Sequence, residues 1–284
     1  MRVAACLGFF FFSVASMGQL EHPKASPAAQ VIQKVGFATI EIAYSRPATR
    51  GRKIFGDLVP YGRIWRVGAN ESTKITVDAT IDILGNALPA GTYALYAFPE
   101  ADQWEIVFHK NTTHWGDGRQ KYNPDEDAFR VVLKPQESQE HRENFLIAFD
   151  HISHDSADLI LHWAKTKITI PLNVDTHSIM EGQILSRLSQ DPTAQTYYEA
   201  ARYYVEQDIK HAVALEFLAK ALAIGGDTYY FHRVKSLAEA KLGKLEVAIA
   251  SAEKSLQLAQ AQGKDEFVRM NQKNIDLWNK KLKK

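Results

Sequence analysis

The sequence predicts an α+β protein in two parts, an antiparallel β-sandwich followed by an α-helical module. Short apolar runs with a spacing of two fill the first part of the chain, and residues typical of turns separate them. Beyond residue 174 the spacing becomes three and four, which indicates amphipathic helices. With 284 residues and 45% hydrophobic content, the chain is long and apolar enough to form two domains with separate cores.

Residues 1–18 fit a secretory signal peptide. The apolar run Val3–Val14 is too short to remain as a membrane span, and small residues precede a cleavage point before Gln19. Cys6 is the only cysteine and would leave with the signal, so the mature protein would lack disulfides and thiolate metal ligands. We therefore expect a secreted protein of the Gram-negative periplasm, with no transmembrane segment in the mature chain.

The predicted β-sandwich domain covers residues 35–173, after a linker at residues 19–34 that is rich in proline and alanine. Each predicted strand places apolar side chains on one face at every second position. The alternating runs are Ile40/Ile42/Tyr44, Ile75/Val77, Ile81/Ile83, Tyr93/Leu95, Trp104/Ile106/Phe108, Val131/Leu133, Phe145/Ile147/Phe149, Leu159/Leu161/Trp163 and Ile168/Ile170/Leu172. Because no helical pattern separates these runs, we expect antiparallel sheets rather than a nucleotide-binding α/β fold.

The helical module is predicted at residues 196–284, after a connector at residues 174–195. Its small and apolar residues recur 34 positions apart, in the pairs Ala214/Ala248, Leu218/Ala252 and Ala221/Ser255. This is the period of tetratricopeptide (TPR) repeats, in which small residues let paired helices approach closely. An amphipathic helix from Asp265 to Leu282 would cap the stack. We expect a TPR-like module that offers a surface for a protein partner.

Aromatic residues gather in the helical module, at Tyr197-Tyr198, Tyr203-Tyr204 and Tyr229-Tyr230-Phe231. They could line a concave peptide-binding face, or they could fill the seam between the helices and the β domain. Because the repeats are so few, we favour the seam.

The segment from residue 44 to residue 71 combines arginine, glycine, proline and aromatic residues. Between residues 46 and 71, five arginines and one lysine stand against two acidic residues, a local charge of +4 in a chain whose net charge is +1. The near-zero net charge of the whole chain argues against a nucleic-acid partner. Guanidinium groups bind carboxylates and phosphates in pairs of hydrogen bonds, and aromatic rings can supply an apolar floor. The predicted ligand-binding residues are Arg46, Arg50, Arg52, Tyr61, Trp65, Arg66, Asn70 and Glu71.

Several interpretations of this segment stay open. In the first, the arginines converge on a polar or anionic ligand of a non-catalytic binding or assembly protein. In the second, Arg66 pairs with Glu71, Trp65 packs inward, and the glycines and prolines shape a crossover between strands. A hydrolase of envelope glycans or peptides would instead use Glu71 or a histidine, with the arginines stabilising an oxyanion. A purely structural envelope protein would bind no ligand.

The histidines are predicted to be solvated turn residues. Asp150-His151 and His154-Asp155 bring donors together near a hairpin turn, but the spacing fixes no third metal ligand. His109 and His114 flank a loop and receive the same interpretation. No G-x-S-x-G motif is present. We therefore predict no catalytic residue, no metal site and no cofactor.

Distinctive motifs run through the β region. They are Tyr44-Ser45-Arg46-Pro47, Gly51-Arg52-Lys53-Ile54-Phe55-Gly56, Leu58-Val59-Pro60-Tyr61-Gly62, Trp65-Arg66, Gly68-Ala69-Asn70-Glu71, Leu88-Pro89-Ala90-Gly91-Thr92-Tyr93, Trp104 and Trp115-Gly116. On these motifs the region resembles an uncharacterised family of secreted bacterial proteins, a domain of unknown function designated DUF2911. Members of that family often carry a similar helical tail, so the likeness covers nearly all of the mature chain. The resemblance implies the domain organisation but no activity, ligand or catalytic residue.

Overall fold

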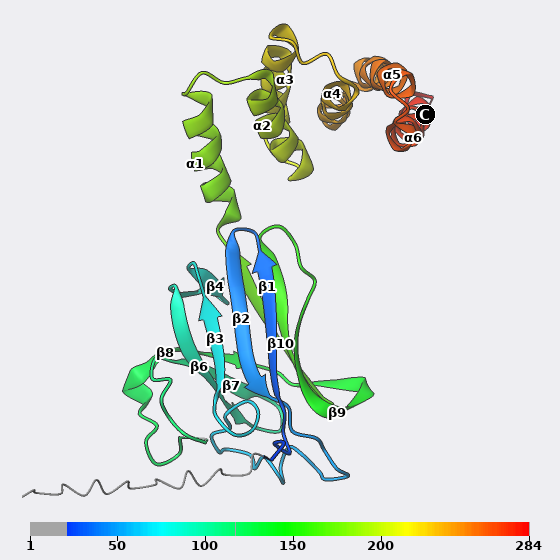
Figure 1. Ribbon diagram of the computed structural model, residues 1–284. Helices are drawn as coiled ribbons and strands as arrows, with labels where there is room; N and C mark the ends of the chain where they lie inside the picture. Colours follow the sequence, from blue (N-terminus) through cyan, green and yellow to red (C-terminus); the bar gives the residue numbers. More distant parts are fainter. Residues whose placement is uncertain (1–21, 117, 284) are drawn as a thin grey trace, which may run out of the picture. The chain divides into compact units, whose positions relative to one another are not determined.

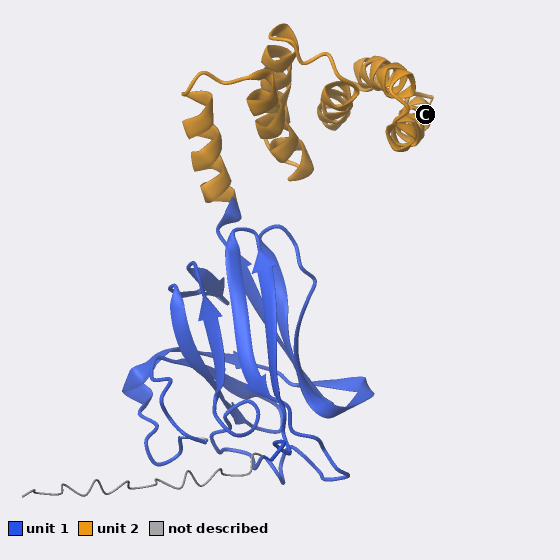
Figure 2. Ribbon diagram, viewed as in Figure 1, with its two compact units in different colours: residues 1–176 blue, residues 177–284 orange. Residues whose placement is uncertain are grey.

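The computed structural model describes residues 22–116 and 118–283 and divides the chain into two compact units (Figures 1 and 2). The first unit ends at residue 176 and holds two antiparallel sheets, while the second, residues 177–284, is helical. The predicted α+β fold in two parts is therefore confirmed. The signal peptide predicted at residues 1–18 lies outside the described residues.

The larger sheet has six strands in the order β1-β2-β3-β6-β7-β8, and all neighbours are antiparallel. Its strands are β1 (Ala28–Val35), β2 (Ala38–Ser45), β3 (Thr73–Val77), β6 (Gly91–Pro99), β7 (Trp104–His109) and β8 (Asp127–Leu133). The smaller sheet follows the order β5-β4-β10-β9. Its strands are β4 (Ile81–Ile83), β5 (Asn86–Leu88), β9 (Gln136–Asp150) and β10 (Ser156–Val174).

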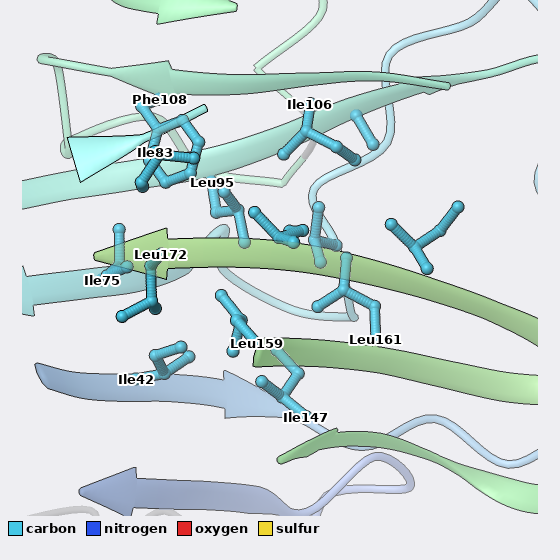
Figure 3. Packing of buried hydrophobic residues seen from close by; sticks show 14 of the residues in the cluster. Ile42, Ile75, Ile83, Leu95, Ile106, Phe108, Ile147, Leu159, Leu161 and Leu172 are labelled. Atoms are coloured by element: carbon cyan, nitrogen blue, oxygen red, sulfur yellow. The ribbon is translucent and has the colours of Figure 1, made fainter. Parts of the chain in front are cut away.

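The core of the first unit lies between the two sheets (Figure 3). Ile42, Ile75 and Leu95 of the larger sheet are fully buried, and so is Leu159 of the smaller sheet. The period of two in each strand turns these side chains inward, and each contributes about 1.5–3 kcal/mol by leaving water. The alternating runs in the sequence therefore mark the residues that hold the sandwich together.

Two strands and one helix depart from the boundaries expected from the sequence. β1 begins at Ala28, inside the expected linker, because it pairs along its whole length with β2 although its inward positions are only half-buried. α1 (Thr176–Leu188) occupies most of the expected connector. The two runs expected around Leu159 and Ile168 belong to the single strand β10, which bulges at Ala164 with a φ of 50°.

The second unit consists, within the described residues, of α1 and five further helices. These are α2 (Ala194–Glu206), α3 (His211–Ala223), α4 (Tyr229–Lys241), α5 (Leu245–Ala261) and α6 (Asp265–Leu282). Members of the pairs that recur 34 positions apart are fully buried, as Ala214 and Ala248 show. Small residues at these positions let neighbouring helices approach closely. Among the described residues, none of the helices combines the length and apolar character needed to cross a membrane.

The aromatic residues of the helical module fill its own interior. Tyr198 stacks on Phe231 with ring centroids 4.5 Å apart, and Tyr203 and Tyr204 are buried in the same cluster. Rings that are already packed against helix neighbours offer little surface to a peptide. The rings therefore fill a seam between helices of their own unit, whereas the sequence predicted a seam between the helices and the β domain.

Candidate functional site

The arginine-rich segment connects β2 to β3 and includes residues in left-handed backbone conformations. Arg50 has a φ of 49° and Asn70 a φ of 61°. At Gly68, with a φ of 150°, a Cβ atom would lie 2.9 Å from the carbonyl oxygen of Ser45. Only glycine fits such a close approach without displacing the backbone. The glycine therefore fixes the path of the segment beside the end of β2.

Two of the predicted ligand-binding arginines contact backbone carbonyls. Nε of Arg46 donates to the carbonyl of Phe145 at 2.9 Å, and Nη2 of Arg50 reaches the carbonyl of Ala25 at 3.4 Å. Neither side chain lines the pockets described below. Arg46 thus links the arginine-rich segment to β9. This contact agrees with the interpretation in which the segment braces the fold.

Arg52, Trp65 and Arg66 come together at one pocket of about 250 Å³. The full lining is Ser26, Pro47, Arg52, Leu58, Val59, Trp65, Arg66, Gly68, Ala69 and Trp163. The guanidinium of Arg52 is oriented by its Nε, which donates to the carbonyl of Thr49 at 2.9 Å, and by Nη2, which donates to Ala48 at 2.7 Å. The pocket thus joins two cationic side chains with an aromatic surface.

The aromatic floor of this pocket is rigid. Trp65 and Trp163 stack with ring centroids 6.1 Å apart and an interplanar angle of 18°. Each indole N–H has a backbone partner, at 3.2 Å for Trp65 with Gly68 and at 3.3 Å for Trp163 with Glu143. Side chains held in this way lose little further freedom when a ligand binds.

The remaining predicted residues lie elsewhere. Asn70 and Glu71 line a second pocket, of about 190 Å³, together with Lys24 and Lys74. The amide of Asn70 donates to the carbonyl of Ser26 and to the hydroxyl of Ser45, both at 3.0 Å.

Tyr61 lines neither pocket and is 42% exposed. The eight predicted residues therefore form one group of three, one group of two and three separate side chains.

A cluster of polar side chains also lies on the outer face of the larger sheet, at the end of β7. Trp104, Ile106 and Phe108 point into the core, whereas Val107 belongs to a separate cluster on the opposite face with Tyr96. His109 packs against the ring of Tyr96, with centroids 5.6 Å apart, and is fully buried.

The ring of His109 lies between two acidic side chains. Its Nδ1 is 2.8 Å from Oδ1 of Asp127, and its Nε2 is 3.4 Å from Oε2 of Glu126. A ligand atom from each of His109, His114 and Glu126 lies within 4.8 Å of the other two. Within the described parts of the chain, Nε2 of His109 and Nδ1 of His114 are buried without a hydrogen-bond partner. Two imidazoles and a carboxylate are donors that could hold a divalent metal.

Further hydrogen bonds hold the two carboxylates of the cluster. Asp127 accepts hydrogen bonds from the hydroxyl of Tyr122 at 2.8 Å and from Nε of Arg130 at 2.8 Å. Burial and the neighbouring Asp127 raise the pKa of Tyr122, which keeps its hydroxyl a donor. Glu126 ends the short 3-10 helix Pro124–Glu126 and accepts from the amide of Asn111 at 3.2 Å.

His114 lies in the loop that follows β7. A Cβ atom on Gly118 would lie 3.1 Å from Nδ1 of His114, so the ring rests close to a backbone position that has no side chain. Burial, together with the nearby His109, lowers the pKa of His114.

The comparison with known families comes from the β unit. The family model described as "Protein of unknown function (DUF2911)" matches residues 26–172, which is more than half of the chain. The chain belongs to this family. No curated protein matches the chain. The DUF2911 description names no activity, so any function must be argued from side chains.

In this DUF2911 protein, the prediction that His109 and His114 are solvated turn residues is wrong. The two side chains are 0% and 6% exposed, because the loop after β7 folds back over the outer face of the sheet. One signal is present in the sequence: His109 lies in the outward phase of the strand that Trp104, Ile106 and Phe108 define, so it belongs to that strand rather than to the loop. By contrast, His151 is a solvated turn residue, with a side chain 77% exposed.

Proposed function

We propose that this protein is a non-catalytic binding protein whose β unit holds a small anionic ligand in the pocket lined by Arg52, Trp65 and Arg66. The observation that carries this proposal is the convergence of two arginines and a tryptophan in one pocket of about 250 Å³. A carboxylate or phosphate would accept hydrogen bonds from the guanidinium groups, while an apolar part would lie against the indole rings.

The pocket suits binding because its parts are held in place before a ligand arrives. Two carbonyls fix the plane of the Arg52 guanidinium, and the indole N–H groups of Trp65 and Trp163 are both satisfied by backbone oxygens. The pocket side chains therefore lose less conformational entropy when a ligand of matching shape binds. Charge-assisted hydrogen bonds in a partly enclosed pocket are about twice as strong as neutral ones.

A fluorescence titration tests this function, because Trp65 and Trp163 report on the pocket. Wild-type protein is titrated with inorganic phosphate, acetate and benzoate, and the Arg52→Gln and Arg66→Gln variants are titrated with the same anions. We expect saturable quenching by at least one anion, and affinity reduced about tenfold or more in both variants.

Arg63→Gln is the matched control, since Arg63 is an exposed arginine of the same segment that does not line the pocket. Circular dichroism confirms that each variant is folded. Equal affinity in wild type and both pocket variants, or an equal loss in Arg63→Gln, would remove the case for a ligand site here.

We also propose that the protein is secreted to the periplasm and that its helical unit contacts a protein partner. Secretion is supported by the apolar run Val3–Val14 and the small residues that follow it. A partner surface is supported by a pocket of about 250 Å³ in the helical unit, whose lining includes Leu237, Trp278 and Lys241. Expression in a Gram-negative host followed by N-terminal sequencing tests the first point, with Gln19 as the expected first residue of the periplasmic form.

A further inference from the structure

We propose that His109, His114 and Glu126 form a binding site for a divalent transition metal of the zinc class, on the outer face of the larger sheet. The site goes beyond the anion pocket, since its three side chains are separate from Arg52, Trp65 and Arg66. The key observation is that two imidazole nitrogens are buried near a carboxylate without hydrogen-bond partners in the described residues.

The spacing of two of the donors matches zinc coordination. Metal–ligand bonds of about 2.0–2.1 Å at the tetrahedral angle place two donor atoms about 3.3–3.5 Å apart. Nε2 of His109 and Oε2 of Glu126 are 3.4 Å apart. One ring nitrogen of His114 lies within 4.8 Å of a ligand atom of each of the other two residues, which places all three donors around one small volume. The spacing of His109 and Glu126 is thus that of two ligands of one metal ion.

Asp127 prepares His109 for this role. A carboxylate 2.8 Å from Nδ1 keeps the proton on that nitrogen and leaves the lone pair of Nε2 directed toward the cluster. Tyr122 and Arg130 hold Asp127 in turn through hydrogen bonds of 2.8 Å each. A histidine that donates its second ring N–H to a carboxylate is the usual arrangement behind a metal ligand.

The donor types select the metal class. Imidazole nitrogen suits zinc, copper, iron and nickel, whereas calcium and magnesium prefer sites made only of oxygen. Three protein ligands leave a fourth position for water or a small anion. The charges around the cluster are mixed, because Glu126 opposes the positive potential that Lys121 and Lys74 exert at His114. A divalent cation would satisfy both buried nitrogens and the carboxylate together.

The alternative is a structural pair in which protonated His109 bonds Glu126. That arrangement would use Nε2 of His109 but would leave Nδ1 of His114 buried and unsatisfied, at a cost of about 1–3 kcal/mol. A metal ion bound by both histidines would give each ring a partner. The two interpretations therefore differ in what they require of His114.

The test is metal binding by the full chain. Protein freed of metal with EDTA is titrated with Zn²⁺ by calorimetry and with Co²⁺ by visible absorption. We expect one equivalent to bind, and the Co²⁺ complex to show the strong absorption of four-coordinate geometry. His114→Gln and Glu126→Gln should each weaken Zn²⁺ binding by tenfold or more.

His151→Gln is the matched control, because His151 also lies 2.8 Å from a carboxylate, that of Asp158, but belongs to no group of three donors among the described residues. Glu126 is 40% exposed at its side chain, so Glu126→Gln should fold even if His114→Gln does not. Wild type that binds less than one equivalent would overturn the proposal. Unchanged affinity in Glu126→Gln, or an equal loss in His151→Gln, would do the same. Arg52→Gln should bind Zn²⁺ as wild type does, which separates this test from that of the anion pocket.

Discussion

At the scale of single residues, Asp127 can set the orientation and tautomer of His109 without itself being one of the three proposed metal ligands. It lies 2.8 Å from Nδ1 of His109 and is itself 8% exposed at its side chain. Its carboxylate keeps the ring proton of His109 on Nδ1 and leaves the lone pair of Nε2 available. Asp127 is therefore a positioning residue for the proposed metal site.

Asp127→Asn should weaken Zn²⁺ binding about 10–100-fold, the usual cost of removing such a carboxylate behind a metal ligand. The matched control is Asp158→Asn, which removes the carboxylate beside exposed His151. ¹⁵N spectra of the histidine rings should show a changed tautomer balance at His109 in Asp127→Asn alone. A variant that keeps wild-type affinity and an unchanged His109 spectrum would deny Asp127 this role.

Residue type indicated that Arg52, Trp65 and Arg66 gather at one pocket, but it did not indicate the histidine cluster. Arginine and tryptophan within fourteen residues of each other, at Arg52, Trp65 and Arg66, pointed to a shared site, and the structure brings these three together. Convergence of His109, His114 and Glu126 depends instead on a loop folding over the outer face of the sheet. Sequence spacing carries no record of that fold, because it is set by packing of the loop on Tyr96 and Val107.

At the scale of elements, the end of β2 and the chain that follows it cover part of a sheet edge. β9 is the last strand of the smaller sheet, and the segment from Tyr44 to Thr49 bonds along its free side. The carbonyl of Pro47 accepts from the amide of Phe145 at 2.9 Å, and the amide of Thr49 donates to the carbonyl of Glu143 at 2.8 Å. Covered edges cannot recruit strands from other chains. Residues 44–49 of the arginine-rich segment thus cover the edge of β9, whereas Arg52, Trp65 and Arg66 line the pocket.

Tyr44 begins this cover and joins the two sheets. Its hydroxyl accepts from the amide of Ile147 at 3.1 Å and lies 3.4 Å from the carbonyl of the same residue. Tyr44→Phe should lower the free energy of unfolding by about 1–3 kcal/mol, because a buried amide loses its partner. Urea denaturation measures the loss, and amide hydrogen exchange should accelerate at Ile147. Tyr61→Phe, at an exposed tyrosine, should change neither measurement.

Glu143 makes the same cover sensitive to acid. Its carboxylate accepts from the hydroxyl of Thr49 and from the amide of Arg50 at 2.8 Å, and these bonds hold its pKa below the ordinary range. A depressed pKa gives stability that is present above the unfolded pKa and is lost as pH falls through the folded value. Glu143→Gln should therefore reduce the difference in urea midpoint between pH 7 and about pH 3.

The control for this pH test is Glu140→Gln, which removes an exposed carboxylate that pairs with Arg142. It should leave the difference between the two pH values nearly as in wild type. An equal reduction in both variants would show that Glu143 has no special part in acid unfolding.

Strand periodicity explains which elements the sequence predicted. Runs such as Trp104, Ile106 and Phe108 carry large side chains that alternate clearly, and they became strands. β1 escaped prediction because alanine and polar residues fill much of it and its inward side is only half-buried. β5, with three residues, is too short for any period to show. Strands that are held mainly by hydrogen bonds to a neighbouring strand, rather than by buried side chains, show little apolar alternation in the sequence.

On the scale of the whole molecule, each unit has its own hydrophobic core. The hydrophobic clusters among the described residues draw either from residues 29–174 or from residues 180–278, and none draws from both. The helical unit adds a buried polar chain, in which Arg233 donates to Asn271 at 3.1 Å and Asn271 donates to Ser255 at 2.7 Å. These bonds join α4, α5 and α6 internally. The units therefore have separate sources of stability.

Separate cores predict two calorimetric transitions in the full chain. Leu218→Ala should lower only the transition of the helical unit, by about 2–5 kcal/mol, because it leaves a cavity at a fully buried position. Ile106→Ala should lower only the other transition, since Ile106 is fully buried between the sheets. Added Zn²⁺ should raise the transition that Ile106→Ala lowers, because a ligand stabilises only the unit that binds it. A single transition shifted by both substitutions would contradict this prediction, because it would mean that the two units unfold as one cooperative body. Zn²⁺ would then also stabilise the helical unit, which holds none of its proposed ligands.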